Sequence, residues 1–339
     1  MTAMPIVTVD GELEPAELGV TICHEHCFID LTAAFDGDDD RPVEPSLLAE
    51  LRTRPFSTTR DNMLLDDDEV ASAELARFAE LGGRTVVDVT PIGAGRDPQR
   101  LRRLSAATGL NIVMGTAFYV EALHPPFVRE LSVDALAALF EREIRDGVDG
   151  VRAGVIGELG VSGAPIPAEE EKVLRAGARA ALATGAAVSL HLDPLPPHPA
   201  LPAIDVLVEE GLPSDRIVAG HLDVVQDLDL HRAVAARGVF LGFDQLGCEC
   251  YADELGPNFS WGHDAWRLPF IQALVDAGHG GQLLLSQDVA MKMDLRAYGG
   301  RGYAHVLRWV VPTLEQLGVP RTALDAMLVE NPARAFALR

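Results

Sequence analysis

The sequence predicts a single-domain (β/α)8 TIM barrel. Its 339 residues are many for an ordinary domain but normal for one closed barrel. Apolar residues make up 48% of the chain, enough to fill a large core. Short apolar segments alternate with amphipathic helical ones, which favours parallel strands joined by helical crossovers. An open doubly wound sheet is the alternative, but no Gly-x-Gly-x-x-Gly turn follows any predicted strand. We expect residues 1–339 to form one domain.

Each element has its own sequence signal. Strands are predicted where β-branched and aliphatic residues cluster: 20–27, 84–90, 111–117, 153–159, 187–192, 217–221, 239–243 and 282–288. Helices are predicted at 69–81, 97–107, 133–146, 168–184, 201–210, 227–237, 266–277 and 303–317, with short ones at 321–328 and 331–338. Gly82 and Gly83 end the first helix, Pro167 opens the one at 168–184, and Asn331 is expected to cap the last.

The charge of the chain excludes some partners. With 28 basic and 51 acidic residues, the net charge is −23. Such a chain repels nucleic acid and anionic membranes, so a small-molecule substrate is expected instead. The acidic run Asp36–Asp40 lacks the ligand spacing of a calcium loop and is expected to be solvated. No secretory signal, bilayer-spanning run or cysteine framework is apparent, so we expect a cytoplasmic protein.

The first predicted strand carries two histidines, His24 and His26. Residues two apart in a strand face the same side, so both imidazoles are expected to project together. Neutral imidazole is the commonest metal ligand, and the pair therefore predicts half of a metal site. The alternative is a pair of hydrogen-bonded core histidines.

Other predicted strands also end in residues that bind metals: Glu158 in the fourth, His191 in the fifth, His221 in the sixth and Asp288 in the eighth. Functional side chains of a (β/α)8 barrel gather at the carboxyl ends of its strands. Each residue alone could be a salt-bridge partner, a core histidine or a helix cap. Together with the first pair they exceed what one tetrahedral site needs, and so predict two metals.

Further side chains are expected near the same rim. Tyr119, after the third strand, and Lys292, after the eighth, are candidates to polarise a substrate oxygen, although either could be structural. Asp244 ends the seventh strand. Aromatic residues on that strand and beyond it either wall an apolar pocket or pack normally: Phe243, Trp261 and Trp266.

With these motifs assembled, the chain resembles the phosphotriesterase family of the amidohydrolase superfamily, and more closely its branch with a bridging glutamate. The resemblance covers nearly the whole chain. It rests on Gly19-Val-Thr-Ile-Cys-His-Glu-His26, Gly154-Val-Ile-Gly-Glu-Leu-Gly160, Gly220-His-Leu-Asp223 and Ser286-Gln-Asp288. These motifs are specific in combination.

The resemblance implies a ligand set. His24, His26 and Asp288 would hold one metal, His191 and His221 the other, and Glu158 would bridge the two. The best-known organophosphate hydrolases of the family carry a carbamylated lysine at this bridging position, so efficient phosphotriester hydrolysis is not implied here. Zinc is expected, with manganese, cobalt and iron as alternatives. A homodimer is the assembly that the resemblance suggests.

We therefore expect a binuclear metal-dependent hydrolase in which a metal-bridging hydroxide attacks an ester-type bond, most readily a lactone or carboxylic ester. Asp288 is expected to carry the proton from the hydroxide to the leaving group. Hydrolysis of an amide or N-acyl bond at the same site is the first alternative. A non-catalytic metal-containing binder and a single-metal decarboxylase-type barrel are the others.

Overall fold

The computed structural model describes residues 5–257 and 259–339. Within them, eight parallel strands are hydrogen-bonded in the order β12-β11-β10-β9-β8-β7-β6-β3. Each barrel strand therefore lies beside the barrel strand that comes next along the chain. The strands are β3 (Thr21–Glu25), β6 (Thr85–Asp88), β7 (Asn111–Thr116), β8 (Val155–Val161), β9 (Ala187–Leu192), β10 (Ile217–Ala219), β11 (Phe240–Phe243) and β12 (Leu283–Leu285).

The two outer strands of this order meet at a seam. The backbone N–H of His24, on β3, donates to Ser286 Oγ at 2.9 Å, just beyond β12. The backbone N–H of Asp288 donates to the carbonyl of His24 at 3.2 Å. These bonds bring the first and last barrel strands together, and the predicted single-domain (β/α)8 barrel is confirmed.

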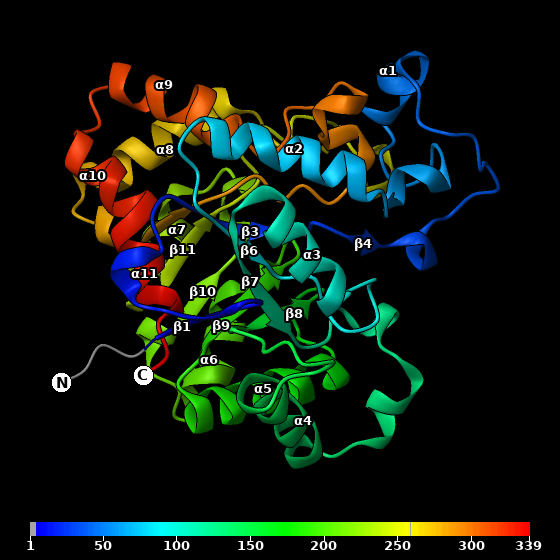
Figure 1. Cartoon of the computed structure of the whole chain (residues 1–339). Coiled ribbons are helices and arrows are strands. Elements are labelled where there is room, and N and C mark those ends of the chain that lie inside the picture. The colour runs from blue at the N-terminus through cyan, green and yellow to red at the C-terminus, as the bar shows by residue number, and fades with distance from the viewer. Residues whose placement is uncertain (1–4, 258) are drawn as a thin grey trace.

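Helices surround the strands (Figure 1). They are α1 (Leu48–Leu51), α2 (Asp68–Glu80), α3 (Pro98–Thr108), α4 (Val133–Arg145), α5 (Ala168–Thr184), α6 (Ala200–Glu209), α7 (Leu228–Ala235), α8 (Asp264–Asp276), α9 (Val311–Gln316), α10 (Arg321–Asp325) and α11 (Asn331–Phe336). Among the described helices, none combines the length and the apolar character needed to cross a bilayer.

Apolar side chains fill the inside of the barrel and close its lower end, which is the end opposite to the carboxyl ends of the strands. Val87, Val113 and Val218 belong to one buried cluster inside the strands. Ile6, on the hairpin β1 (Ile6–Thr8) and β2 (Gly11–Leu13), and Phe336, on α11, join the same cluster and are fully buried. Figure 1 places β1 beside the C-terminus, in agreement with the bond from Leu338 N–H to the Pro5 carbonyl at 3.0 Å.

Several predicted strands are too long at their carboxyl ends, and in two of them a predicted ligand lies beyond the strand in a left-handed backbone. β10 stops at Ala219 and β12 at Leu285, before His221 and Asp288. His221 has a φ of 56° and Asp288 a φ of 49°, which is the left-handed region that non-glycine residues seldom adopt. The extended backbone predicted through both residues is therefore wrong, because a left-handed turn aims each side chain into the barrel mouth.

The C-terminal helices also differ from the prediction. A π-helical turn, Val306–Val310, precedes α9, and another, Ala326–Glu330, joins α10 to α11. Asn331 therefore lies within a continuous helical run and does not cap a new helix. Its buried amide donates instead to the carbonyls of Gly280 at 2.9 Å and Leu283 at 2.8 Å, which fastens the helix to β12.

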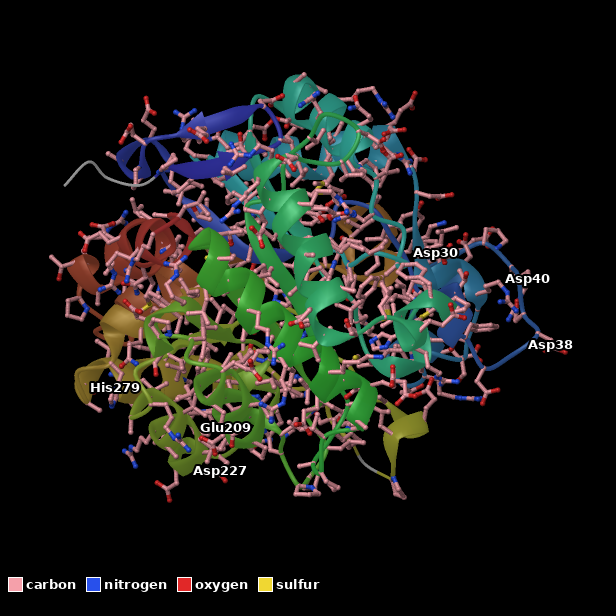
Figure 2. All side chains as sticks on the ribbon, turned by 90° about the horizontal axis from the view of Figure 1, so that it is seen from below. Asp30, Asp38, Asp40, Glu209, Asp227 and His279 are labelled. Carbon is pink, nitrogen blue, oxygen red and sulfur yellow. The ribbon has the colours of Figure 1, made fainter. Side chains whose placement is uncertain are left out.

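The acidic run Asp36–Asp40 lies on a loop at the edge of the molecule, as Figure 2 shows for Asp38 and Asp40. Arg60 Nε donates to Asp40 Oδ1 at 2.9 Å, and Arg41 pairs with Asp39. These contacts are between exposed side chains, in keeping with the solvated loop predicted from the sequence.

Candidate metal centre

The first group of predicted ligands meets at the seam of the barrel. His26 Nε2 lies 3.1 Å from Asp288 Oδ1 and 3.4 Å from Glu158 Oε1. His24 Nε2 lies 3.2 Å from Glu158 Oε2. All four residues are buried. The histidines face the same side as predicted, although β3 has a register shift between Ile22 and Glu25 and ends before His26.

The second group approaches Glu158 from the other side. Glu158 Oε2 lies 3.4 Å from His191 Nδ1 and 3.6 Å from His221 Nε2, and the two imidazole nitrogens are 2.9 Å apart. Glu158 thus directs Oε1 toward His26, while its Oε2 lies among His24, His191 and His221. A carboxylate placed between two nitrogen groups has the position that a bridging ligand requires.

Several atoms of this cluster have unsatisfied hydrogen-bonding capacity. Among the described residues, His24 Nε2, Glu158 Oε2 and Asp288 Oδ1 are buried without a hydrogen-bond partner of acceptable geometry. Buried polar atoms are normally paired, because an unpaired one loses its hydration without compensation. Nitrogen and carboxylate oxygen atoms that converge in this way suit a divalent cation such as zinc, so the residues fit the metals that the family resemblance implies.

The electrostatics of the cluster also favour a cation. Burial lowers the pKa of His26, but the nearby carboxylates of Asp288 and Glu158 outweigh it and raise that pKa to about 10. Burial raises the pKa of Asp288, but His24, His26 and His221 outweigh it and lower that pKa to about 2. The two carboxylates therefore create a strongly negative potential at the imidazole nitrogens.

Neighbouring groups hold the imidazoles in orientation. Asp244 Oδ1 accepts hydrogen bonds from both the backbone N–H and Nδ1 of His221 at 2.9 Å, and Asp244 Oδ2 lies 3.5 Å from His24 Nδ1. Thr90 Oγ1 lies 2.9 Å from His26 Nδ1. The contacts on His221 and His26 fix Nδ1 of each ring and leave Nε2 directed at the centre.

A cavity of about 590 Å³ opens above the cluster. His191, Asp288 and Tyr119 form part of its floor, and apolar side chains form much of its wall. The lining residues are Leu31, Ala34, Asp36, Arg54, Phe56, Ser57, Tyr119, Val120, Ser162, His191, Asp193, Pro194, Gln245, Cys248, Glu254, Leu255, Trp261, Asp288, Ala290 and Met291. The cavity gives a small molecule access to the ligand cluster.

The two further candidates, Tyr119 and Lys292, occupy different places. Tyr119 lines the cavity, with its hydroxyl 3.1 Å from His191 Nδ1. Lys292 lines a separate small pocket, and its ammonium donates to Asp61 Oδ1 at 2.6 Å. The ion pair links two loops, and Lys292 is not among the described residues that line the large cavity, so the catalytic role of Lys292 stays a prediction that this placement does not support. The role of Tyr119 stays a prediction.

Of the three aromatic residues predicted to wall a pocket or pack normally, one lines the cavity and two pack elsewhere. Trp261 lines the cavity. Phe243 is fully buried in the core, and Trp266 lies on α8 with its Nε1 buried. Of these three, only Trp261 contributes to the cavity among the residues that the structure describes.

Sequence reasoning missed the roles of Gln245 and Glu25. Gln245 follows Asp244 directly and donates from Nε2 to Asp288 Oδ2, so its place after a strand end was the available signal. Glu25 lies between the two histidines on the opposite face of the strand. Its carboxylate accepts from Ser286 Oγ at 2.7 Å and from the N–H of Gln287 at 2.8 Å, which strengthens the seam.

Comparisons with known proteins agree with this geometry. The model of the phosphotriesterase family matches residues 4–336. An N-acetyltaurine hydrolase of Rattus norvegicus is 35% identical over 96% of both chains. The crystal structure of a resiniferatoxin-binding protein from Rhodobacter sphaeroides superposes with a TM-score of 0.93 at 37% identity, covering 98% of this chain and 94% of that one. A lactonase from Listeria monocytogenes gives a TM-score of 0.80 at 26% identity over 99% of each chain.

The amide hydrolase among these relatives matches the first alternative drawn from the sequence rather than the ester-type expectation. The enzyme class is a hydrolase whether the bond is an amide or an ester. A family match over nearly the whole chain, hydrolases among its relatives and a ligand cluster at the barrel mouth identify this chain as a metal-dependent hydrolase that belongs to the phosphotriesterase family.

Proposed function

We propose that this chain hydrolyses the amide bond of a small N-acyl compound. The observation that carries the proposal is the cluster of six side chains of metal-ligand types with Glu158 at its middle, at the floor of a cavity open to small molecules. N-acetyltaurine hydrolases that match 96% of the chain support the amide bond over the ester.

The ligand set divides between two divalent ions. His24, His26 and Asp288 would hold one ion, His191 and His221 the other, and Glu158 would contact both. When bound, such ions act as Lewis acids and make water a good nucleophile at neutral pH. Zinc is the first candidate for the identity of these ions, because the donors are imidazole nitrogens and carboxylate oxygens.

The remaining chemistry belongs to side chains around the cavity. Asp288 Oδ1 faces the centre while Gln245 holds Oδ2, so Oδ1 is placed to receive a proton and return it to the leaving nitrogen. The hydroxyl of Tyr119, at the cavity floor, is placed to donate to the carbonyl oxygen of the substrate.

The cavity also suggests the size and polarity of the substrate. Its volume of about 590 Å³ falls within the roughly 300–1,000 Å³ of sites for drug-sized molecules. Phe56 and Trp261 wall it, with ring centroids 5.7 Å apart, and Arg54 is the arginine that lines it. We infer that the substrate carries an apolar group beside the scissile bond and that Arg54 pairs with an anionic group on it.

Lactone hydrolysis is the second candidate, supported by the lactonase neighbour. The same ligand set serves both reactions, since each passes through a tetrahedral intermediate whose oxygen needs stabilising. The leaving group is what differs: a nitrogen must be protonated as it departs, which makes Asp288 more important for amides than for lactones.

The test is a turnover screen with N-acetyltaurine, longer N-acyl amides, lactones, carboxylic esters and phosphotriesters, in parallel with Asp288→Asn. We expect an N-acyl amide to give the highest kcat/KM, and the variant to keep metal while losing about 10²–10⁴-fold of that activity. A lactone preferred over every amide would overturn the amide proposal. Metal and substrate binding without turnover would favour a binding protein instead.

A further inference from the structure

A three-residue hydrogen-bonded chain leads from the cavity wall to the metal-ligand cluster. Trp261 Nε1 donates to Gln245 Oε1 at 2.8 Å, and Gln245 Nε2 donates to Asp288 Oδ2. Asp288 Oδ1 then faces His26 Nε2 at 3.1 Å. The chain joins a side chain that a substrate would touch to one that is expected to bind metal.

The indole fixes which way the amide of Gln245 points. Trp261 Nε1 can only donate, so the atom of Gln245 that faces it must be the oxygen. The NH2 group must then face Asp288, where it can donate to the carboxylate. His221 Nδ1 lies 3.3 Å from Gln245 Nε2 but already donates to Asp244, so it does not decide the orientation. Without the indole N–H, Gln245 Oε1 loses its donor, so only the bond to Asp288 still positions the amide and the donor on Oδ2 is less firmly held.

The orientation matters because Asp288 has two oxygens with different tasks. Gln245 occupies Oδ2, and Oδ1 remains without a hydrogen-bond partner of acceptable geometry among the described residues. Asp288 also has a left-handed backbone, with φ at 49°, which local sequence preference does not hold in place. A fixed donor on Oδ2 therefore keeps Oδ1 directed at His24 and His26.

The backbone around Trp261 is held by hydrogen bonds from Arg267. Its carbonyl accepts from Arg267 Nη2 at 2.7 Å, and Arg267 Nη1 donates to the carbonyl of Cys248 at 2.9 Å. The guanidinium of Arg267 is fully buried and lies 3.3 Å from Asp223 Oδ2. Asp223 in turn accepts from the backbone N–H of Gln245 at 3.1 Å. The buried ion pair of Arg267 and Asp223 thus holds the backbone of both residues in this bond: Arg267 binds Trp261, and Asp223 binds Gln245.

We propose that Trp261 is a positioning residue of this enzyme: through the amide of Gln245 it directs Asp288 Oδ1 at the metal site. Gln245 acts as the connecting donor. The inference rests on the proposed metal site but not on the identity of the substrate. It assigns to Trp261 a function beyond the shape of the cavity wall.

The test compares Trp261→Phe with Trp266→Phe. The first change removes the indole N–H but keeps an aromatic ring in the wall. The second makes the same chemical change on α8, away from the cavity lining. We expect Trp261→Phe to lower kcat by about 3- to 10-fold with little change in KM, as expected for one lost hydrogen bond that positions a catalytic group. It should also speed the loss of bound metal to a chelator, while Trp266→Phe leaves both rates at the wild-type value.

A second variant tests whether the effect passes through the amide. Gln245→Leu should lower kcat and speed metal loss at least as much as Trp261→Phe, and adding Trp261→Phe to it should change neither rate by more than about twofold. Additive losses would overturn the proposal, since Trp261 would then act through its own contacts. A rise in KM alone for Trp261→Phe would overturn it as well.

Two controls separate the possible failures. If Trp261→Phe does not fold, Gln245→Glu replaces it: this variant keeps an acceptor for the indole but loses the donor to Asp288, so metal loss at the wild-type rate would overturn the proposal. A wild-type protein that binds no metal would overturn the proposed metal site. Wild-type metal binding with equal rates for the two tryptophan variants would overturn only the positioning role.

Discussion

At one end of the barrel, Ile6 and Phe336 close an interior of valine, alanine and leucine side chains. At the other end, buried imidazoles and carboxylates face one another with unpaired atoms, and two of their residues have left-handed backbones. Burial at the lower end removes apolar surface from water and stabilises the fold. Burial at the mouth leaves polar atoms unpaired, which destabilises it. The difference teaches that the stability and the chemistry of this chain reside in different halves of the same strands.

The largest effect is expected from Glu158→Ala at the mouth. The change removes the carboxylate that lies between the two histidine groups, so metal content should fall from about two ions per chain toward one or none. Turnover should fall by about a thousandfold or more, because metal-ion catalysis contributes several kcal/mol. Elemental analysis and kcat, measured on protein purified without chelator, check both. Two ions retained in the variant would contradict the bridging role of Glu158.

At the lower end, Phe336→Ala should lower the stability of the fold and leave turnover unchanged. Phe336 is fully buried in the cluster that closes the barrel. Its truncation should lower the free energy of unfolding by about 3–5 kcal/mol, the usual cost of removing a large buried side chain. Urea denaturation measures this loss, and kcat per folded molecule should stay at the wild-type value. A loss of kcat without a loss of stability would erase the contrast between the two ends.

A smaller effect is expected from Asp294, which lies in the loop after β12. Burial raises the pKa of Asp294 from its ordinary value of 3.8 to about 7. The folded state therefore holds this proton more tightly than the unfolded state, and the stability that it contributes is complete below about pH 4 and lost as the pH rises through 7. Between about pH 5 and pH 8 this single group should cost about 2–3 kcal/mol.

Asp294→Asn should remove that part of the pH dependence. Urea denaturation at several pH values would show the difference between variant and wild type growing toward high pH. The matched control is Asp229→Asn, an exposed carboxyl on α7. Curves for Asp294→Asn and wild type that stay parallel would mean that Asp294 is ionised at no cost to the fold.

The sequence predicted the barrel because strand and helix periodicity are local properties. It also predicted the six ligand candidates, because metal-binding residue types at strand ends are visible in one dimension. It failed at the ends of β10 and β12, where His221 and Asp288 adopt left-handed backbones that tertiary contacts impose. The place of Lys292 in a separate pocket was not predictable for a similar reason: its partner Asp61 lies 231 residues away in sequence.

The connection from Trp261 to Asp288 was beyond the reach of the sequence as well. The place of Gln245 after a strand end indicates the barrel mouth but not its partners, and Trp261 reaches Gln245 through a loop that is bonded to Arg267. What decides these positions is a set of single hydrogen bonds, and residue patterns do not encode their geometry.

The ligands of the proposed first metal lie on both sides of the seam between β3 and β12, so a bound metal would connect the two ends of the barrel sheet. The residues hydrogen-bonded across it, His24 and Ser286, are 262 positions apart. A cation shared by His24, His26 and Asp288 would act as a reversible cross-link that closes most of the polypeptide into a ring. Closing so long a loop is entropically costly for the unfolded chain but costs nothing more once the barrel has formed. Bound metal would therefore stabilise the folded barrel relative to the unfolded chain.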